Sequence, residues 1–309
     1  MLLSFQAVFP LLAFMLLGLF LRRVNLLDER TASGLNKLVF RVFLPINIFQ
    51  SVYSADIRSA FDLKVCLYVA LTCILSFLVI SLTVGRAEKD KTIAPVMVQG
   101  IHKANYNLLS IPIVSSFFGN ELGMTAVLIF IITPIVNTCS TIAFESARGG
   151  TASFPKMLRK IILNPMVYSS VLGLLVNISG LRIPALIMSS VLSKLGAIAT
   201  PAAMLALGSG FDFKAVRRHA RRLGIVCLGK LIILPAILTT GAALLGIRGA
   251  NLIATLMYSG SPTAVNSYST AVSMGGNEEL AGEVVAVTSL LSVFTLFLFL
   301  TALQALGLV

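Results

Sequence analysis

The residues best suited to bind a ligand lie in one short polar stretch inside an otherwise apolar segment. Burying several polar side chains in hydrocarbon is costly unless they pair with one another or face water. A proline removes a backbone donor and clashes with the preceding turn, so Pro112 predicts a helix break that frees carbonyl groups near Leu108. The stretch therefore predicts a substrate-binding site on a broken helix, with candidates Gln99, His102, Lys103, Asn105, Tyr106, Asn107, Ser110 and Pro112.

A second polar stretch, residues 258–271, also contains a proline. Its candidate binding residues are Pro262, Thr263, Asn266 and Ser267. If the two interruptions cross within a membrane, the N-termini of the half-helices present unsatisfied N–H groups to a shared cavity. Such groups favour an anion, so the pair of interruptions predicts an anion-binding site.

Three ionisable side chains in apolar segments have competing interpretations. Lys103 fits a counter-ion for the anion, but it also fits a cation that snorkels to the cytoplasmic surface. His102 titrates in a range suited to a proton shuttle, although a lone helix histidine is more often a hydrogen-bonded structural residue. Lys230, five residues before Pro235, fits a packing contact better than a substrate contact.

The motifs give no support for an enzyme, an ATP-driven pump or a metal centre. The sequence has no HExxH, GxSxG or P-loop motif. No aspartate pair interrupts either polar stretch, which weighs against a sodium–proton antiporter that titrates carboxylates. The four cysteines lie in apolar runs without CxxC spacing and indicate packing. We therefore expect a protein that is not an enzyme, with no catalytic residues, no metal and no cofactor.

The elements that position these residues are membrane helices. Hydrophobic residues make up 57% of the 309 positions and charged residues 12%, about half the charged share of a soluble domain. Apolar runs near the length of a bilayer-spanning helix recur along the chain. They predict an all-α integral membrane protein with ten transmembrane helices, at residues 2–21, 35–52, 65–84, 92–118, 124–144, 161–178, 186–207, 223–245, 252–274 and 284–303.

The basic residues predict the orientation of these helices. One set of alternate loops carries 16 Lys and Arg residues, and the other set carries Arg58, Lys64, Arg182 and Arg248. The positive-inside rule places the first set in the cytoplasm and both termini outside, in a multi-pass protein of the cell membrane. The net charge of +12 is thus a topology signal, and we expect no nucleic-acid partner.

The two halves of the chain share a pattern. A proline is followed eight residues later by a glycine in the first and sixth predicted helices, and LNKL at 35–38 matches LSKL at 192–195. Five helices per repeat forces the halves into opposite orientations, a plan common in secondary transporters. We expect one membrane domain, 1–309, made of repeats 1–147 and 155–309. The residues that match between the repeats are Pro10 and Gly18 with Pro165 and Gly173, and Pro45 with Pro201.

Several segments resemble the auxin efflux carrier family. QGIHKANYNLLSIPI (99–113) is similar to that family's fourth helix, LNKLVFRVFLPINIF (35–49) to its second, NPMVYSSVLGLL (164–175) to its sixth, and residues 261–296 to its ninth and tenth. The short loop 145–160 resembles the bacterial branch rather than the plant carriers. Asn107 and Ser110 depart from the pattern, because many relatives have glycines there.

The resemblance implies two inverted five-helix repeats, as in the bile-acid–sodium symporter group. Helices 1, 2, 6 and 7 would form a scaffold, and helices 3–5 and 8–10 a moving part. Family substrates are organic anions, including auxin in plants and malonate or malate in some bacterial relatives. By this likeness Asn105 and Pro112 form one half of the crossover site, and Pro262 and Asn266 the other half.

The leading hypothesis is a secondary transporter of a small carboxylate that works by alternating access, of elevator type. The alternatives are a sodium-coupled symporter of a larger amphipathic anion and a membrane sensor that does not transport. Expected partners are the organic anion and the lipid bilayer. A coupling ion, either proton or sodium, and a homodimer are left open.

Overall fold

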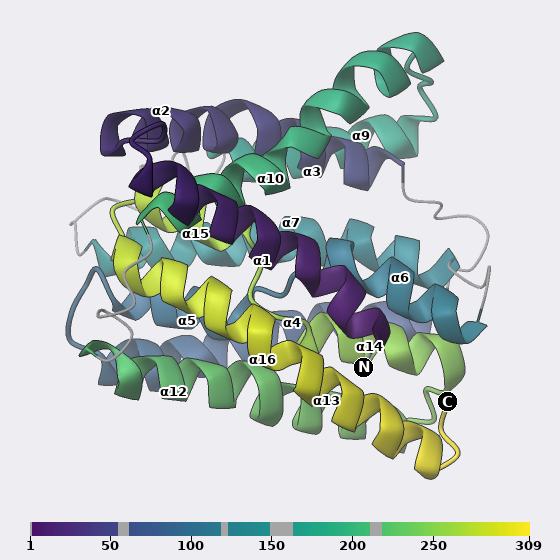
Figure 1. Ribbon diagram of the computed structural model, residues 1–309. Helices are drawn as coiled ribbons and strands as arrows, with labels where there is room; N and C mark the ends of the chain where they lie inside the picture. Colours follow the sequence, from purple (N-terminus) through teal and green to yellow (C-terminus); the bar gives the residue numbers. More distant parts are fainter. Residues whose placement is uncertain (1, 55–61, 119–122, 149–162, 211–217) are drawn as a thin grey trace.

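The computed structural model describes residues 2–54, 62–118, 123–148, 163–210 and 218–309. Every regular element in these residues is a helix, which confirms the predicted all-helical class (Figure 1). The first half contains α1 (Leu2–Arg23), α2 (Glu29–Leu38), η1 (Val39–Phe43), α3 (Leu44–Tyr53), α4 (Leu63–Ala87), α5 (Ala94–His102), α6 (Tyr106–Phe118) and α7 (Gly123–Ala147). The second half contains α9 (Pro165–Ser179), η2 (Ile187–Leu192), α10 (Ser193–Gly210), α12 (Ala220–Leu228), η3 (Gly229–Ile233), α13 (Leu234–Leu244), α14 (Gly249–Gly260), α15 (Asn266–Ser273) and α16 (Glu278–Ala305).

Length and composition identify membrane-crossing helices among the described residues. Five continuous stretches are long and apolar enough to span a bilayer: Leu63–Ala87, Val127–Ala147, Ile187–Gly210, Ala220–Leu244 and Glu278–Ala305. Apolar side chains also cover much of the outer surface, as on α4, where Leu67, Leu71 and Leu78 are exposed. Such a surface suits hydrocarbon rather than water, and the chain is therefore a multi-pass membrane protein.

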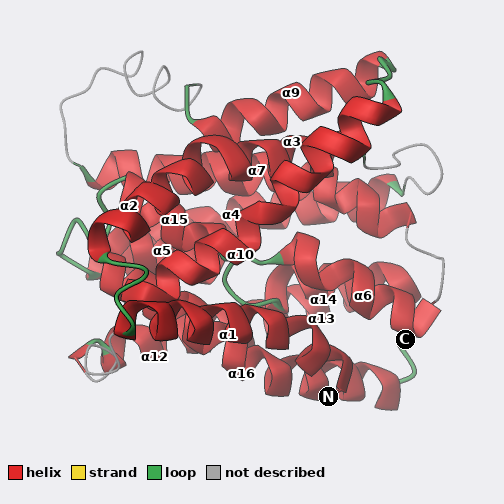
Figure 2. Ribbon diagram, turned by 45° about the horizontal axis from the view of Figure 1, so that its top comes forward, coloured by secondary structure: helices red, strands yellow, loops and turns green. Residues whose placement is uncertain are grey.

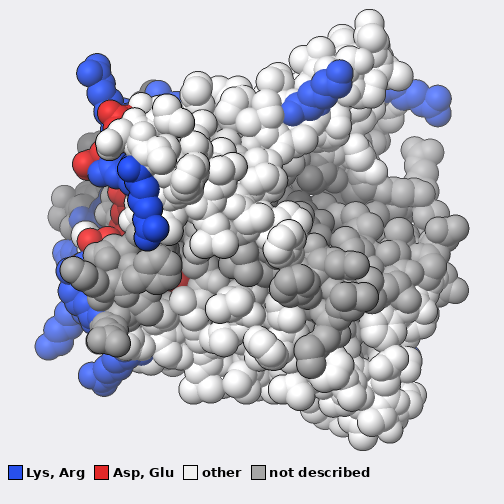
Figure 3. Space-filling view, viewed as in Figure 1, with Lys and Arg blue, Asp and Glu red and all other residues white. Residues whose placement is uncertain are grey.

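Charged side chains are concentrated at one end of the helical bundle. Figure 3 shows most of the basic and acidic side chains of this face at the left, with a few basic ones toward the upper right. Both described chain ends lie at the right in Figure 1. The apolar band between the two ends is the part that a bilayer would cover.

Two of the long helical segments widen into a π-helical turn just before a proline. The turn η1 precedes Pro45, and the turn η3 precedes Pro235. A proline lacks the N–H that would bind the carbonyl one turn earlier, and a local widening of the helix accommodates this defect. The first of these turns continues into α3, which contributes Asn47 to the site described below.

The two halves of the chain pack against each other through reciprocal helix pairs. Helix α1 packs along α10, and α3 packs along α9. A Cβ atom on Gly18 of α1 would overlap the backbone carbonyl of Leu205 in α10. A Cβ atom on Gly173 of α9 would lie 2.8 Å from the carbonyl oxygen of Phe49 in α3. Glycine at these two positions therefore allows close helix contact.

The buried apolar residues form two clusters. One cluster joins residues of η1, α3 and α10 to residues of α5, α15 and α16. The other lies among α4, α6, α7, α13, α14 and α16. The polar crossover described next runs between these apolar regions, so its backbone groups are shielded from lipid.

Candidate functional site

Two helices are interrupted at the centre of the bundle, and the interruptions contact each other (Figure 2, the green segment in the middle of the bundle). The first break, Lys103–Asn105, separates α5 from α6, and the second separates α14 from α15. The N–H of Asn105 donates to the carbonyl of Pro262 at 2.8 Å, and the N–H of Ala264 donates to the carbonyl of Lys103 at 3.0 Å. This short antiparallel bridge satisfies backbone groups that would otherwise be buried without partners.

The local sequence explains one of the two breaks. Ser261 has extended backbone angles, φ −62° and ψ 150°, and it precedes Pro262. A residue before proline is disfavoured in the helical region, so α14 ends there. Lys103 is also extended, at φ −86° and ψ 105°, but no proline follows it. The first break is therefore stabilised by its pairing with the second.

The predicted position of the first break was wrong. The sequence placed it at Pro112, whereas α6 begins at Tyr106 and continues through Pro112 to Phe118. A proline is tolerated inside a membrane helix where neighbouring groups take up the freed carbonyl. The break lies at residues 103–105 because that segment meets the loop around Pro262.

Hydroxyl groups fix the crossover to the surrounding helices. Thr263 Oγ1 donates to the carbonyl of Gly100 at 2.7 Å, which joins the second break to α5. The N–H of Thr263 donates to Thr288 Oγ1 of α16 at 3.1 Å. Thr263 is fully buried, so these bonds form in a low-dielectric environment where they are strong.

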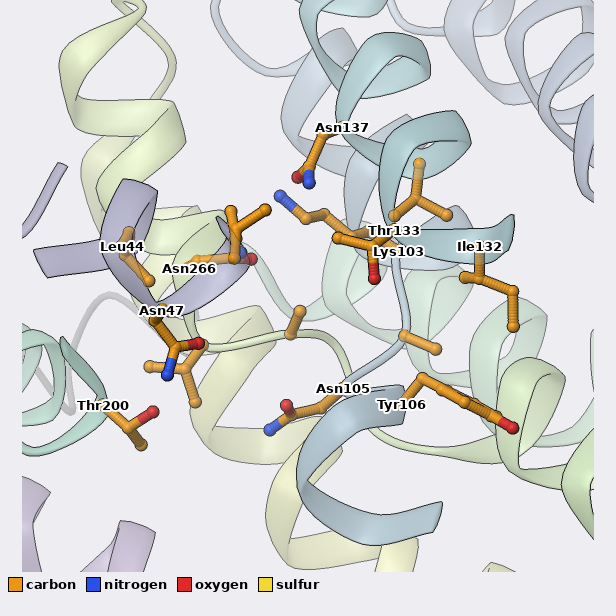
Figure 4. A pocket seen from close by; sticks show the side chains of 15 residues that line it. Leu44, Asn47, Lys103, Asn105, Tyr106, Ile132, Thr133, Asn137, Thr200 and Asn266 are labelled. Carbon is orange, nitrogen blue, oxygen red and sulfur yellow. The ribbon is translucent and has the colours of Figure 1, made fainter. Parts of the chain in front are cut away.

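A cavity of about 210 Å³ lies beside the crossover (Figure 4). Helices α3 and α10 line it with Asn47 and Thr200, and α7 lines it with Thr133 and Asn137. The crossover and the adjoining helix ends supply the rest of the wall. None of the lining residues is acidic; they are Leu44, Asn47, Ile48, Lys103, Ala104, Asn105, Tyr106, Ile132, Thr133, Val136, Asn137, Thr200, Ala264, Val265 and Asn266.

Lys103 is the one basic residue among those that line the cavity. The residue is 2% exposed, and its Nζ atom has no hydrogen-bond partner among the described residues. Its side chain extends toward Asn137 in Figure 4. A buried ammonium without a partner is unfavourable, and an anion in the cavity would offset that cost.

Two helix N-termini add to this electrostatic preference. Helix α6 begins at Tyr106 and α15 begins at Asn266, and both residues line the cavity. The first N–H groups of a helix lack partners within the helix and attract negative charge. The Nδ2 atom of Asn105 and the Oδ1 atom of Asn266 also have no partner among the described residues. The site can therefore hold an anion with the Lys103 ammonium and the Asn105 amide nitrogen, whereas the N–H groups of Ser267 and Tyr268 in α15 already donate to the carbonyls of Ala264 and Val265.

The structure describes the side chains of ten of the twelve predicted site residues, and these ten fall into three groups. Lys103, Asn105, Tyr106 and Asn266 line the cavity, although the Tyr106 ring extends away from it and its hydroxyl donates to the carbonyl of Thr125 at 3.2 Å (Figure 4). Pro262 and Thr263 build the crossover without lining the cavity. A third group is buried but does not line the cavity: Gln99, His102, Ser110 and Ser267. The side chains of Asn107 and Pro112 are outside the described part of the structure.

His102, the last residue of α5, does not line the cavity. Its Nε2 atom is 2.9 Å from the carbonyl oxygen of Cys73, and its ring meets Phe77 edge-on at 5.5 Å between centroids. These contacts match the hydrogen-bonded structural interpretation of this residue. Among the described residues, Lys230 is also a fully buried lysine in an apolar segment, and it does not line the cavity.

Sequence reasoning missed four polar lining residues: Asn47, Thr133, Asn137 and Thr200. Each lies in a mostly apolar helix, where an Asn or Thr alone gives no indication of a site. A signal was nonetheless present for two of them, because Asn47 lies two residues after the matched proline Pro45 and Thr200 lies immediately before Pro201.

A multi-pass helical bundle with a polar crossover at its centre defines a membrane transport protein. The chain belongs to the family described as membrane transport protein, whose model matches residues 3–300. It is 26% identical over 300 residues to an uncharacterized transporter of Methanothermobacter thermautotrophicus, covering 95% of this chain and 96% of the relative. It is 23% identical over 301 residues to a Rhizobium meliloti protein named "Putative malonate transporter", covering 93% of this chain and 92% of that protein. These findings confirm the resemblance stated from the sequence.

Proposed function

We propose that this protein is a secondary transporter that moves a small organic anion, a carboxylate, across the cell membrane by alternating access. The observation that carries the proposal is the buried Lys103 ammonium in a cavity that no carboxylate lines. The N-termini of α6 and α15 reinforce the preference for negative charge. The name of the Rhizobium relative, which refers to malonate, belongs to the same substrate class.

The cavity volume favours a small substrate. About 210 Å³ is below the range of roughly 300–1,000 Å³ that pockets for drug-sized ligands occupy. The lining also has many amide and hydroxyl groups for a molecule of this size. A short carboxylate fits these properties better than the larger amphipathic anion of the alternative hypothesis.

The position of the cavity supports an elevator-type motion. Asn47 and Thr200 belong to the group formed by α1, α3, α9 and α10. Lys103, Asn137 and Asn266 belong to the other group, which contains the crossover. A sliding movement of the second group against the first would carry the substrate while each group keeps its own packing.

The reciprocal helix pairs support two inverted five-helix repeats, 1–147 and 155–309, with ten transmembrane helices. Gly18 and Gly173, matched in the sequence, contact Leu205 and Phe49. These partners also correspond, since each lies four residues after a matched proline. The basic end of the bundle in Figure 3 lies opposite the described chain ends, which supports cytoplasmic loops and external termini.

The test is uptake by proteoliposomes that contain the purified protein. A panel of labelled mono- and dicarboxylates, run with a sodium gradient, a proton gradient and no gradient, should identify a transported acid and its coupling. Asn105→Ala should abolish that uptake, because it removes the amide at the N-terminus of α6. The matched control Asn251→Ala, on α14 away from the cavity lining, should retain uptake. Full activity of Asn105→Ala would refute the assigned site, and specific binding without flux would favour the sensor.

A further inference from the structure

A groove of about 290 Å³ lies on the outer surface, separate from the central cavity. One wall is formed by η1 and α3, with Arg41, Pro45 and Phe49, and the other by α9, with Tyr168 and Leu172. Residues spaced by four lie on one face of a helix, so each wall is a continuous stripe. From position 41 to position 49 the groove extends about 12 Å along the helix axis.

The surface around this groove is exposed and apolar, as expected of a surface that contacts lipid. Leu172 is 49% exposed and Val42 is 38% exposed, although both lie in apolar membrane segments. Most of the lining is apolar, which suits an acyl chain. Any hydrocarbon chain could occupy this part of the groove, so the specificity of the groove for one kind of lipid depends on the charged residue at one end.

Arg41 is that residue. It is exposed in the π-helical turn η1, and it has no carboxylate partner among the described residues. An arginine at membrane depth is costly unless its long side chain reaches polar groups at the interface. Arg41 lies four residues after Lys37, which belongs to the basic set of loops, so its guanidinium is within reach of the headgroups on that side.

We propose that this groove binds one anionic phospholipid from the leaflet next to the basic end of the bundle. The lipid phosphate contacts the Arg41 guanidinium, with the Tyr168 hydroxyl beside it, and an acyl chain lies along Pro45 and Phe49. Basic pockets between membrane helices on the cytoplasmic side are suited to such headgroups. The site is independent of the transport function proposed above.

A second copy of the chain is a poorer occupant. A twofold contact brings the same surface of both copies together, so the two Arg41 side chains would approach each other. The lining residues of the groove include no carboxylate that could compensate for this. An anionic lipid, in contrast, supplies the missing negative charge.

The absence of tryptophan from the chain makes a direct test possible. A single Leu172→Trp substitution places a fluorophore in the groove, and Leu71→Trp on the exposed face of α4 serves as the matched control. Both proteins are reconstituted with brominated phosphatidylglycerol or brominated phosphatidylcholine, which quench nearby tryptophan. We expect quenching of Leu172→Trp to show about a fivefold preference for phosphatidylglycerol, the effect of one basic residue near a membrane surface. Leu71→Trp should show no preference.

The headgroup preference should disappear in the Leu172→Trp protein that also carries Arg41→Gln. It should persist with Arg30→Gln, an exposed arginine of α2 outside the groove. If both lipids quench the single Leu172→Trp variant, which keeps Arg41, to the same extent, the proposal is overturned. Protection from both lipids together with a crosslinked dimer would overturn it in favour of a second copy.

Discussion

The backbone N–H of Asn105 donates a hydrogen bond to the carbonyl oxygen of Pro262, 157 residues further along the chain and 2.8 Å away. This bond joins two helices that are each interrupted inside the bundle. Neither break is favourable alone in a membrane, because each leaves backbone groups without partners. Together they form a small polar platform that exposes two helix N-termini to one cavity. Two of the predictions below concern the crossover and its charge, and a third concerns the close contact between α1 and α10.

Thr263→Val should weaken the crossover. The substitution removes the Oγ1 donor to the Gly100 carbonyl at 2.7 Å and leaves that carbonyl without this partner. We expect the free energy of unfolding to fall by about 1–3 kcal/mol, the cost of an unsatisfied buried group. Anion uptake should fall as well, because the position of Asn105 depends on the bridge. The unfolding midpoint in detergent and the initial uptake rate are the measurements.

The control for this substitution is Thr83→Val. Thr83 makes a hydroxyl bond of the same length, 2.7 Å, to the Val79 carbonyl on an exposed face of α4. Its loss should change neither stability nor uptake appreciably. Equal effects of the two substitutions would show that the crossover bond has no special role.

Lys103→Met should separate function from stability. Methionine keeps the length of the side chain and removes a buried ammonium that has no partner among the described residues. Replacing buried charge with an apolar group of similar volume is often neutral or stabilising by about 1–4 kcal/mol. We therefore expect an unchanged or higher unfolding midpoint together with loss of anion uptake. A protein that is both less stable and fully active would contradict the role of Lys103.

The sequence predicted the crossover better than the cavity. The residues near the breaks are polar within apolar runs, so the sequence singled out Lys103, Asn105 and Asn266, and all three line the cavity. The direction of each side chain was not, because it depends on the angle at which the broken helices meet. His102 and Lys103 are neighbours in sequence, yet the first bonds to Cys73 and the second lines the cavity.

The residues that sequence analysis missed belong to unbroken helices. Thr133 and Asn137 are four residues apart on α7 and thus lie on one face, but a membrane helix can turn such a face toward any neighbour. Only the packing of α7 against the crossover makes that face part of the site. The location of the first break was missed for a similar reason, since a contact distant in the sequence stabilises it.

The ion pair between Glu88 and Arg222 should make stability depend on acidic pH. Glu88 follows α4 and accepts two hydrogen bonds from the Arg222 guanidinium, at 2.7 and 3.2 Å. These bonds hold the pKa of Glu88 below its ordinary value of 4.5. A carboxyl with a lowered pKa stabilises the fold above its ordinary pKa, and the contribution is lost as the pH falls through the folded value. Because the guanidinium side chain is 34% exposed, we expect no more than about 1 kcal/mol.

The measurement for this pair is the unfolding midpoint as a function of pH for Glu88→Gln, Arg222→Gln and the double variant. Each single substitution should lower the midpoint at pH 7 and flatten its dependence on pH below 4.5. The double variant should lose little more than either single variant. Additive losses would show that the two side chains act independently.

Gly208→Ala should destabilise the contact between α1 and α10. A Cβ atom at this position would overlap the backbone carbonyl of Met15, and a backbone group cannot move aside as a flexible side chain can. We expect the free energy of unfolding to fall by about 1–3 kcal/mol, the usual cost of overpacking. Gly34→Ala provides the matched control, because no atom lies within 4 Å of the added Cβ in α2. Alanine there should raise stability by about 0.5–1 kcal/mol through its higher helix propensity. Thermal unfolding midpoints that shift in opposite directions would support the close packing of α1 on α10, whereas equal shifts would contradict it.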